Sequence, residues 1–304
     1  MDLNVWTLAA TETAHGDVAA ALLQDGSIRA IDVLPPGISP LAVVQRWDEF
    51  CPALRAWSPG SATRLDGARL KAPIRYPSKL ICVGANYKDH REEMDPGGRD
   101  RPPGDPFLFF KPPTTTIIGP GDDILIRGEA DRVDWEAEIA VVIGKPGRFI
   151  DEASAIDHVA GYTLVNDVSA RGAFQPPNPW NPAMAYDWVA HKGQDTFCPT
   201  GPGMLPAWFV PDPDDIRFSL TVNGVMEQDG TTRDLIYSIR AIISAASQLM
   251  TLEPGDIIAT GTPSGVGAAK GRHLVDGDVV VVSSPQIGSL KNTVRELQAA
   301  VAAC

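Results

Sequence analysis

The stretch Asp131-Arg-Val-Asp-Trp-Glu-Ala-Glu-Ile-Ala-Val-Val-Ile-Gly144 carries the pattern that decides the fold. It predicts a β-strand, because Trp, Val and Ile favour extended backbone and a Gly-Lys-Pro-Gly turn sequence closes the run. Successive side chains of a strand point to opposite faces, so Glu136 and Glu138 are expected together on one face. Two adjacent carboxylates repel each other unless a cation lies between them. This stretch alone fits a metal-binding pair and equally an exposed edge strand with two solvated glutamates.

A third carboxylate ends a second apolar segment. Residues 159–171 predict a strand whose polar end is Asn166-Asp167. Such an aspartate either caps the following turn or has a partner, because an unpaired buried carboxylate is unfavourable. Glu136, Glu138 and Asp167 together would supply three oxygen ligands and leave positions open for water and substrate. Oxygen-only ligation favours hard ions, so Mg²⁺ or Mn²⁺ is expected, with Ca²⁺ as an alternative.

Four segments together resemble the fumarylacetoacetate hydrolase family. In chain order they are VGANYKDHREEM (83–94), DWEAEIAVVIG (134–144), AGYTLVNDVSAR (160–171) and PGDIIATGTPSGVG (254–267). The resemblance extends from about Lys79 to about Val294, which is most of the chain. It implies the family's mixed β-sandwich roll beside a small N-terminal domain, assembled as a homodimer.

His90 and Glu93 are the predicted base and its partner. They are three residues apart, so on one helical turn they share a face and can form a hydrogen bond. A carboxylate beside an imidazole raises the imidazole pKa, which prepares it as a general base. Taken alone, the pair would more often be a solvated helix start; the resemblance instead makes it a water-activating dyad on a lid. The Gly- and Pro-rich loop 95–106 that follows is expected to be mobile when the site is empty.

The segment after Asp167 departs from the family pattern. Arg171 is kept and suits a substrate carboxylate, because its guanidinium binds both oxygens. Gly172 stands where the family usually has aspartate, and Gln175 lies one place later than the usual glutamine, so its substrate-binding role is in doubt. A stretch rich in Pro, Asn and Trp then precedes Lys192, the predicted catalytic lysine that would stabilise an oxyanion. The aromatic residues of this stretch, Trp180, Tyr186 and Trp188, are expected to shape a remodelled substrate pocket.

Three further residues belong to the predicted site or its border. Thr262 lies in a glycine-rich loop that lacks the lysine of a phosphate-binding loop, and it could bind a substrate carboxylate. Tyr87 is also assigned to substrate binding by the resemblance. Lys111 ends the apolar stretch 107–110, predicted to be a buried strand, and is interpreted as an edge lysine or a lining group, outside the catalytic set.

Composition limits the class of partner. Basic residues number 26 and acidic residues 38, which gives a net charge of −12 without a cluster of Lys or Arg. Neither nucleic acid nor an anionic membrane is expected to bind such a surface. A small anionic 2-oxo acid remains compatible, because a bound cation can reverse the sign of charge inside a cleft.

Cysteine spacing and the chain ends predict a cytoplasmic protein. Cys51, Cys82, Cys198 and Cys304 show no paired spacing, which is typical of isolated thiols in a reducing compartment. No signal-like N-terminus is present, and no apolar run approaches the ~18 residues of a membrane span.

The fold class follows from many short strands and few helices. The sequence contains 28 Gly and 27 Pro, and its strands do not alternate regularly with helices, which favours a mixed β, β-rich α+β fold. Residues 1–75 predict a small N-terminal α/β domain with a hairpin at 18–33 and a helix at 41–57. Residues 76–304 form the expected catalytic domain.

The predicted activity is metal-dependent cleavage of a C–C bond. The substrate would be an acylpyruvate-type 2,4-dioxo acid, such as a fumarylpyruvate- or maleylpyruvate-like compound from aromatic or sugar-acid catabolism. Its 2-oxo acid end would bind the metal, and water activated by His90 would attack the distal carbonyl, releasing pyruvate and a second acid.

Two alternatives stay open. An isomerase, tautomerase or decarboxylase acting on a 2-oxo or 2-hydroxydiene dicarboxylic acid needs the same enolate, and the sequence does not separate these reactions. A non-catalytic binding protein with this fold would be expected to lack a ligand or the base, and none is missing from the sequence.

Overall fold

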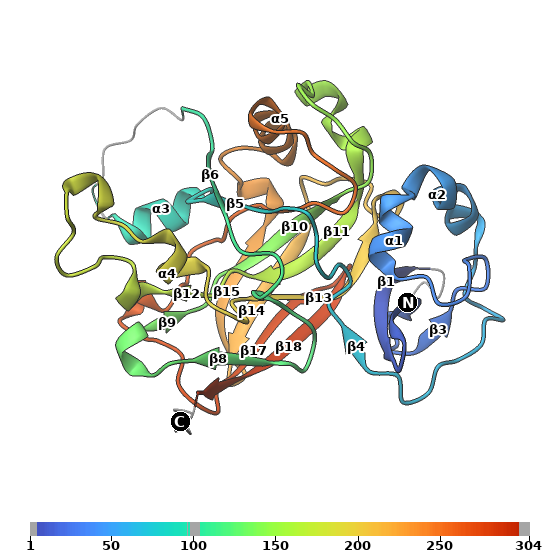
Figure 1. Cartoon of the computed structure of the whole chain (residues 1–304), viewed down its shortest axis with the longest axis horizontal. Helices are drawn as coiled ribbons and strands as arrows, with labels where there is room; N and C mark the ends of the chain where they lie inside the picture. Colours follow the sequence, from blue (N-terminus) through green and yellow to red (C-terminus); the bar gives the residue numbers. More distant parts are fainter. Residues whose placement is uncertain (1–4, 96, 98–103, 298–304) are drawn as a thin grey trace, which may run out of the picture.

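Two β-sheets form the centre of the protein (Figure 1), whose computed structural model describes residues 5–95, 97 and 104–297. The larger sheet has the order β3 (Ile28–Ala30), β2 (Gly16–Leu23), β1 (Trp6–Thr13), β13 (Cys198–Pro206), β11 (Val159–Asn166), β10 (Ala137–Ile143), β16 (Ile257–Ala259), β5 (Leu80–Gly84) and β6 (Phe107–Phe110); β4 (Leu70–Lys71) pairs with β1 and β7 (Ile117–Ile118) with β13. The smaller sheet has the order β15 (Val225–Thr231), β14 (Arg217–Val222), β17 (Val279–Ser284), β18 (Gly288–Glu296) and β8 (Asp123–Ile126). The prediction of a mixed β fold is confirmed.

Short helices and one small ribbon connect the sheets. The α-helices are α1 (Pro40–Gln45), α2 (Trp47–Ala56), α3 (Lys88–Met94), α4 (Trp188–Lys192) and α5 (Ile239–Leu249). The 3₁₀ helices are η1 (Glu129–Asp131), η2 (Glu152–His158), η3 (Arg171–Ala173), η4 (Pro182–Met184), η5 (Ala207–Phe209), η6 (Thr232–Asp234) and η7 (Ala268–Lys270). A two-stranded ribbon pairs β9 (Val133–Asp134) with β12 (Ser169–Ala170). No helix in the described ranges is long and apolar enough to cross a membrane.

The register between β10 and β11 decides where the acidic residues lie. β10 runs between β11 and β16 and is buried along its whole length, so the alternative of an exposed edge strand is excluded. The two strands are antiparallel, with Ala137 opposite Asn166. Just beyond this pair, the Asp167 backbone N–H donates to the Glu136 carbonyl oxygen at 2.8 Å. The end of β11 is therefore fixed beside the start of β10.

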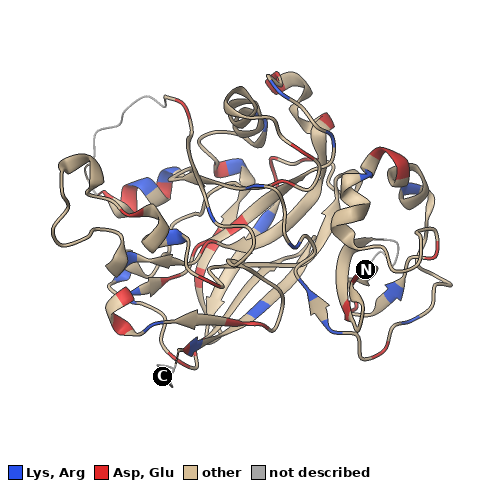
Figure 2. Ribbon diagram, in the orientation of Figure 1, with Lys and Arg blue, Asp and Glu red and all other residues tan. Residues whose placement is uncertain are grey.

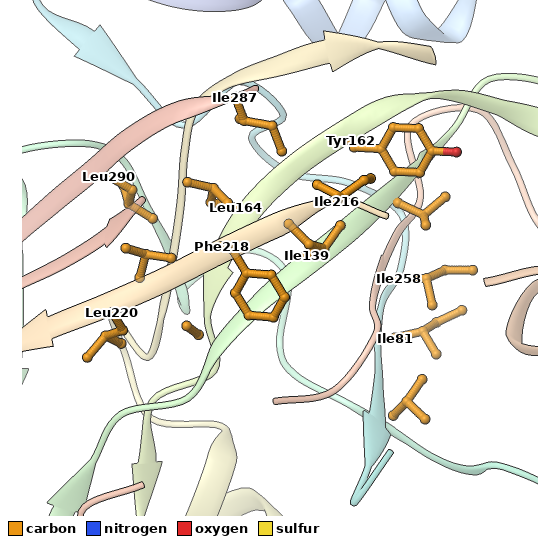
Figure 3. Packing of buried hydrophobic residues seen from close by; sticks show 14 of the residues in the cluster. Ile81, Ile139, Tyr162, Leu164, Ile216, Phe218, Leu220, Ile258, Ile287 and Leu290 are labelled. Carbon is orange, nitrogen blue, oxygen red and sulfur yellow. The ribbon is translucent and has the colours of Figure 1, made fainter. Parts of the chain in front are cut away.

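The two faces of β10 contribute to two different apolar cores. Ile139 and Val141 belong to the core between the sheets, where Figure 3 shows Ile139 near Phe218 of the smaller sheet. Ala140 and Val142 point the other way, into the core beneath the N-terminal helices. This alternation matches the prediction from the sequence, and burial of each large apolar side chain contributes about 1.5–3 kcal/mol. The face that carries the glutamates therefore continues into a packed core.

The N-terminal elements cover that second core. The β2–β3 hairpin is present as predicted, and β1 pairs with β13, so the N-terminal strands extend the larger sheet. The single helix predicted at 41–57 is instead two helices that meet at Arg46, whose φ of −117° and ψ of 38° are not helical. After this change of direction, the Trp47 ring stacks on the Trp208 ring with centroids 5.7 Å apart.

Strand β6 differs from the prediction of a buried strand. Among the described strands it pairs only with β5, at the edge of the larger sheet, and Phe107 and Phe110 are more than half exposed. The residue that follows, Lys111, is fully buried. The predicted mobile loop 95–106 lies largely outside the described residues.

Candidate active site

The carboxylates predicted from the sequence meet at the junction of β10 and β11. Glu136, Glu138 and Asp167 each place one carboxylate oxygen within 4.8 Å of the others, and all three residues are buried. Oxygens that share an octahedral ion at the usual Mg–O distance lie roughly 3–4 Å apart, so the spacing of the three carboxylates is close to that of a shared ion. Figure 2 shows acidic and basic positions both on the central strands and around the periphery of the molecule.

Glu138 has an oxygen that lacks a partner. One carboxylate oxygen accepts a 2.7 Å hydrogen bond from the Gly261 backbone N–H, and the other has no hydrogen bond within the described ranges. Burial, followed by the negative charges of Asp167 and Glu136, raises the pKa of Glu138 well above its usual value. A bound cation would remove this conflict, so the donor set fits a hard divalent ion on chemical grounds.

Two lysines neutralise the other carboxylates. Lys192 Nζ donates to Glu136 Oε2 at 2.8 Å and to Asp167 Oδ2 at 2.6 Å. Burial opposes ionisation of Glu136, but Lys192 and Arg171 outweigh it and lower its pKa. Lys111 Nζ contacts Asp167 Oδ1 and donates to the Val168 carbonyl oxygen at 2.9 Å.

Lys111 therefore corrects the interpretation as an edge lysine. Its side chain is fully buried against a carboxylate of the cluster, so it cannot extend its ammonium into water. The usable signal was a charged residue directly after an apolar strand, the same signal that singled out Asp167.

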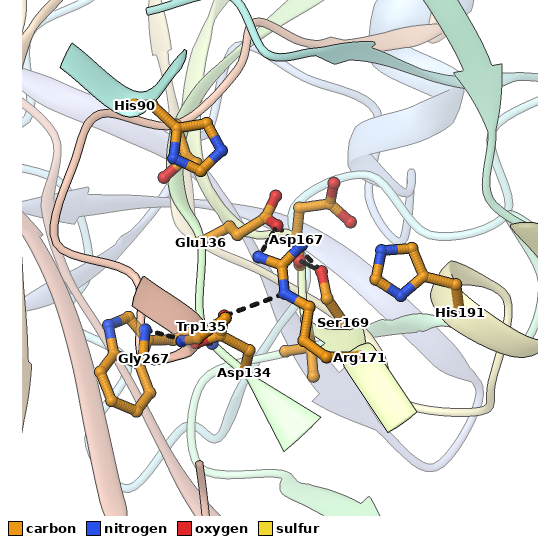
Figure 4. Close-up of polar contacts among 12 residues, drawn as sticks. His90, Asp134, Trp135, Glu136, Asp167, Ser169, Arg171, His191 and Gly267 are labelled. Carbon is orange, nitrogen blue, oxygen red and sulfur yellow. Dashed lines mark hydrogen bonds and ion pairs between the residues drawn. The ribbon is translucent and has the colours of Figure 1, made fainter. Parts of the chain in front are cut away.

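Arg171 is held between two acidic residues, as Figure 4 shows. Its Nε donates to Asp134 Oδ2 at 3.0 Å and its Nη2 to Glu136 Oε1 at 2.5 Å. Asp134 also accepts hydrogen bonds from the Trp135 and Gly267 backbone N–H groups at 2.9 and 2.7 Å. In this structure Arg171 therefore fixes Glu136, and Asp134, which the sequence analysis did not single out, fixes Arg171.

The predicted dyad is formed on α3. His90 Nδ1 lies 2.9 Å from Glu93 Oε1, and because a carboxylate only accepts, Nδ1 carries a proton in this hydrogen bond and Nε2 points away from Glu93. Glu93 is itself held by the Gly265 backbone N–H at 2.9 Å. His90 is buried and lies on the Glu136 side of the cluster (Figure 4), so the solvated helix start is excluded.

The remaining predicted residues differ in how they relate to the cluster. Tyr87 is fully buried, its hydroxyl has no hydrogen-bond partner within the described ranges, and burial together with the Glu138 charge raises its pKa. The Thr262 hydroxyl donates to the Ala137 carbonyl oxygen at 2.8 Å and accepts from a side-chain amide, so its proton is already engaged. Gln175 is exposed and has no hydrogen bond to any described residue, so this structure does not bring it to the cluster.

The departure at Gly172 has a steric reason. A Cβ atom there would lie 2.0 Å from the Ala130 carbonyl oxygen, so the aspartate usual in the family cannot fit against η1. Of the aromatic residues in the following stretch, Trp180 is 85% exposed and contacts no other described ring, whereas Tyr186 and Trp188 pack in a cluster beside Lys192.

Comparison with known proteins gives consistent matches. A sequence profile described as fumarylacetoacetate (FAA) hydrolase C-terminal matches residues 79–295. The oxaloacetate tautomerase YisK of Bacillus subtilis (strain 168) is 41% identical over 236 residues, which cover 76% of this chain and 74% of YisK. A crystal structure of a probable 2-hydroxyhepta-2,4-diene-1,7-dioate isomerase from Mycobacterium abscessus superposes with a TM-score of 0.78 at 32% identity, covering 96% of this chain and 99% of that one. Maleylpyruvate hydrolase from Sphingobium sp. SYK-6, solved with manganese(II) and pyruvate, superposes with a TM-score of 0.75 at 30% identity, covering 96% and 100%.

Proposed function

Because the chain belongs to the fumarylacetoacetate hydrolase family and is an enzyme of that family, we propose that it interconverts the enol and keto forms of a small 2-oxo acid. The observation that carries this proposal is the buried carboxylate cluster, with its unpaired Glu138 oxygen, beside the His90–Glu93 dyad. The similarity to an oxaloacetate tautomerase supports the same reaction class.

The carboxylates and their partners form the binding part of the site. A divalent Mg²⁺ or Mn²⁺ held by Glu136, Glu138 and Asp167 would supply Lewis acidity, which makes a proton beside the substrate's keto group easier to remove. Arg171 and Lys111 hold two of these carboxylates in place through ion pairs. The ligand geometry is thereby set before substrate arrives.

His90 and Lys192 perform the proton transfer and the charge stabilisation. In the keto-to-enol direction His90 Nε2 accepts the proton from the carbon and passes it to the enolate oxygen. In the reverse direction it takes the proton of the enol hydroxyl and delivers it to the carbon, while Glu93 fixes the tautomer and the orientation of the ring. Lys192 lies against two of the carboxylates and can donate a hydrogen bond to the substrate oxygen on which negative charge develops.

Hydrolysis of an acylpyruvate is the second candidate. The same dyad can deprotonate a water molecule, and the similarity to maleylpyruvate hydrolase favours a compound whose C–C bond is cleaved to pyruvate. The products separate the reactions: tautomerisation conserves mass, hydrolysis releases pyruvate and a second acid, and decarboxylation releases CO₂.

The test uses the enzyme loaded with Mn²⁺. The disappearance of enol-oxaloacetate is followed in one assay, and the release of pyruvate from acetylpyruvate and maleylpyruvate in another. Glu138→Ala should lower the tautomerisation kcat/KM by roughly 100- to 1000-fold, since a Lewis acid contributes several kcal/mol. Glu92→Ala, a change at an exposed glutamate of α3, is the matched control. The proposal is wrong if metal-stripped Glu138→Ala protein still tautomerises oxaloacetate at the wild-type rate.

A further inference from the structure

A second histidine lies beside the carboxylate cluster. His191 is in the last turn of α4, next to Lys192, and only 2% of its surface is exposed. Its Nδ1 lies 3.0 Å from the Ala170 carbonyl oxygen. Since a carbonyl oxygen only accepts, Nδ1 must carry the proton.

The other nitrogen of this ring is an available acceptor. His191 Nε2 has no hydrogen bond with any residue of the described ranges, and Figure 4 shows that edge of the ring turned toward the side of the site where Asp167 lies. Burial, together with the Lys192 charge, lowers the pKa of His191 to about 3. The ring is therefore neutral near neutral pH, and Nε2 can accept a hydrogen bond but cannot donate one.

A wall of rings surrounds this imidazole. The Phe174 ring lies 4.3 Å from the His191 ring at an interplanar angle of 33°, and Trp188 lies 4.9 Å from Phe174. Phe109 extends the wall to the cluster, because its ring centroid is 5.3 Å from Lys192 Nζ. Within the described part of the chain, Lys192 is the cation in contact with these rings, and it is already paired with two carboxylates.

The wall is formed without a substrate. The Asp187 backbone N–H donates to the Phe174 carbonyl oxygen at 2.8 Å, which closes the loop between the two residues. The Asp187 side chain then caps α4 by accepting from the Ala190 N–H at 2.8 Å. Phe174, Trp188 and His191 are thus held in one arrangement by contacts within their own segment.

We propose that Phe174, Trp188 and His191 form the subsite for the arm of the substrate that points away from its 2-oxo acid end. The subsite selects a planar, unsaturated or aromatic arm that carries a hydroxyl group, and it disfavours an arm that ends in a second carboxylate. The rings stack on a flat arm, and Nε2 accepts the hydroxyl proton. A carboxylate would bring its charge against the Nε2 lone pair, and the described residues around the wall offer no free cation to pair with it. This specificity rests on the proposed function, because it assumes a 2-oxo acid bound at the carboxylate cluster.

Binding affinity tests the proposal separately from turnover. Calorimetry on the Mn²⁺-loaded enzyme compares pyruvate, oxaloacetate, acetylpyruvate, benzoylpyruvate and the three ring-hydroxylated benzoylpyruvates. At least one hydroxylated isomer should bind about ten-fold more tightly than benzoylpyruvate, the value of one good neutral hydrogen bond. Benzoylpyruvate in turn should bind more tightly than oxaloacetate.

Two variants of His191 separate the contribution of Nδ1, the donor, from that of Nε2, the acceptor. His191→Asn places an amide N–H where Nδ1 stands and removes the acceptor, so the preference for the hydroxylated isomer should be lost. His191→Gln places an amide oxygen near the position of Nε2 and should keep most of that preference. Val189→Ala, at an exposed position on the same helix, is the control. The affinity of each variant for pyruvate and for Mn²⁺ reports whether the variant remains folded around the metal.

The subsite is refuted if no hydroxylated isomer exceeds benzoylpyruvate, if His191→Asn weakens both compounds equally, or if oxaloacetate binds most tightly. If no 2-oxo acid, pyruvate included, binds the Mn²⁺-loaded wild-type protein, the proposed function and the subsite are both refuted.

Discussion

The buried charges around Asp167 are the central feature at the residue scale. Two lysines and an arginine face a cluster of buried acidic side chains. Removing one member of a buried ion pair leaves an unsatisfied charge, which destabilises a protein more than the pair itself stabilises it. The protein is therefore expected to respond to such a change differently with and without a bound ion.

Lys111→Met tests this expectation. In the metal-free protein, the substitution should lower the free energy of unfolding by about 3 kcal/mol, because Asp167 loses a buried partner. With saturating Mn²⁺ the loss should be smaller, since the ion supplies the missing positive charge. Urea unfolding with and without Mn²⁺ measures both values. Lys145→Met, at an exposed position, is the control, and an equal loss in both conditions would contradict the role of Lys111.

The sequence predicted the acidic residues better than the basic ones around them. Glu136 and Glu138 share a face because strand alternation is a local rule, and Asp167 was visible as a charge at the end of an apolar run. Lys111 showed the same signal, but its burial depends on segments distant in the sequence, which no local pattern encodes: its backbone N–H donates to the Leu80 carbonyl oxygen of β5, and its ammonium donates to the Val168 carbonyl oxygen. Asp134 binds Arg171 through contacts between segments far apart in the chain.

At the scale of elements, short irregular segments rather than helices position the active groups. Helix α3 is tied to the glycine-rich loop by Glu93, which accepts from the Gly265 N–H, and by Asp89, which accepts from the Ser264 hydroxyl at 2.7 Å. The prediction of one continuous helix over 41–57 was wrong. The helix breaks at Arg46, and the tertiary packing of Trp47 stabilises the break. Periodicity alone does not reveal such a break.

Gly172→Ala tests the close contact between η3 and η1. The new Cβ atom would lie 2.0 Å from the Ala130 carbonyl oxygen, so the backbone next to Arg171 must shift. The free energy of unfolding should fall by about 1–3 kcal/mol, as is usual for overpacking, and kcat should fall with it. Gly60→Ala is the matched control, because a Cβ atom there meets nothing within 4 Å. Equal stability of the two variants would show that the contact is not tight.

Glu227 links β15 to the glycine-rich region through Lys270 and Arg272. Burial opposes its ionisation, but the two cations outweigh burial and lower its pKa below the ordinary value of 4.5. A carboxylate with a lowered pKa stabilises the fold at neutral pH, and this contribution is lost as the pH falls through its folded-state value.

Glu227→Gln should therefore lower the free energy of unfolding by about 1 kcal/mol at pH 7, a modest value because both cations are partly exposed to solvent. The difference from wild type should stay constant down to about the ordinary glutamate value of 4.5 and then narrow. Urea unfolding between pH 7 and pH 4 measures it, with Glu129→Gln as the exposed control. A difference that does not change with pH would rule out the ion pair as its cause.

At the scale of the whole molecule, the larger sheet is covered by a different layer on each face. The smaller sheet packs on one face, and the N-terminal helices α1 and α2 pack on the other, so the larger sheet, which β1–β4 extend, forms the middle layer. The sequence predicted the β-rich class from its many turns and short strands. It did not show that β1 would pair with β13, because pairing between distant strands depends on the complete fold.

Removal of residues 1–75 tests the role of the N-terminal layer. The deletion would expose Leu80, Cys82, Ala140 and Val142, which pack against that layer. A large apolar face on a sheet promotes association, so the shortened protein should be insoluble or bind a hydrophobic dye strongly. Soluble expression and dye fluorescence measure the effect. A soluble product with the same assembly state and Mn²⁺ affinity as the full-length protein would show that the core between the two sheets is sufficient by itself.

The register of β10 and β11 has a consequence for how this protein could acquire new substrates. The groups that would hold the ion lie in or directly beside the central strands β10 and β11, whereas the rings proposed to contact the substrate arm come mainly from one surface loop and the short helix after it. Mutation and recombination could therefore exchange that loop without disturbing the groups that would hold the ion. Descendants of one ancestral enzyme could in this way come to use different substrates while keeping the same carboxylate cluster.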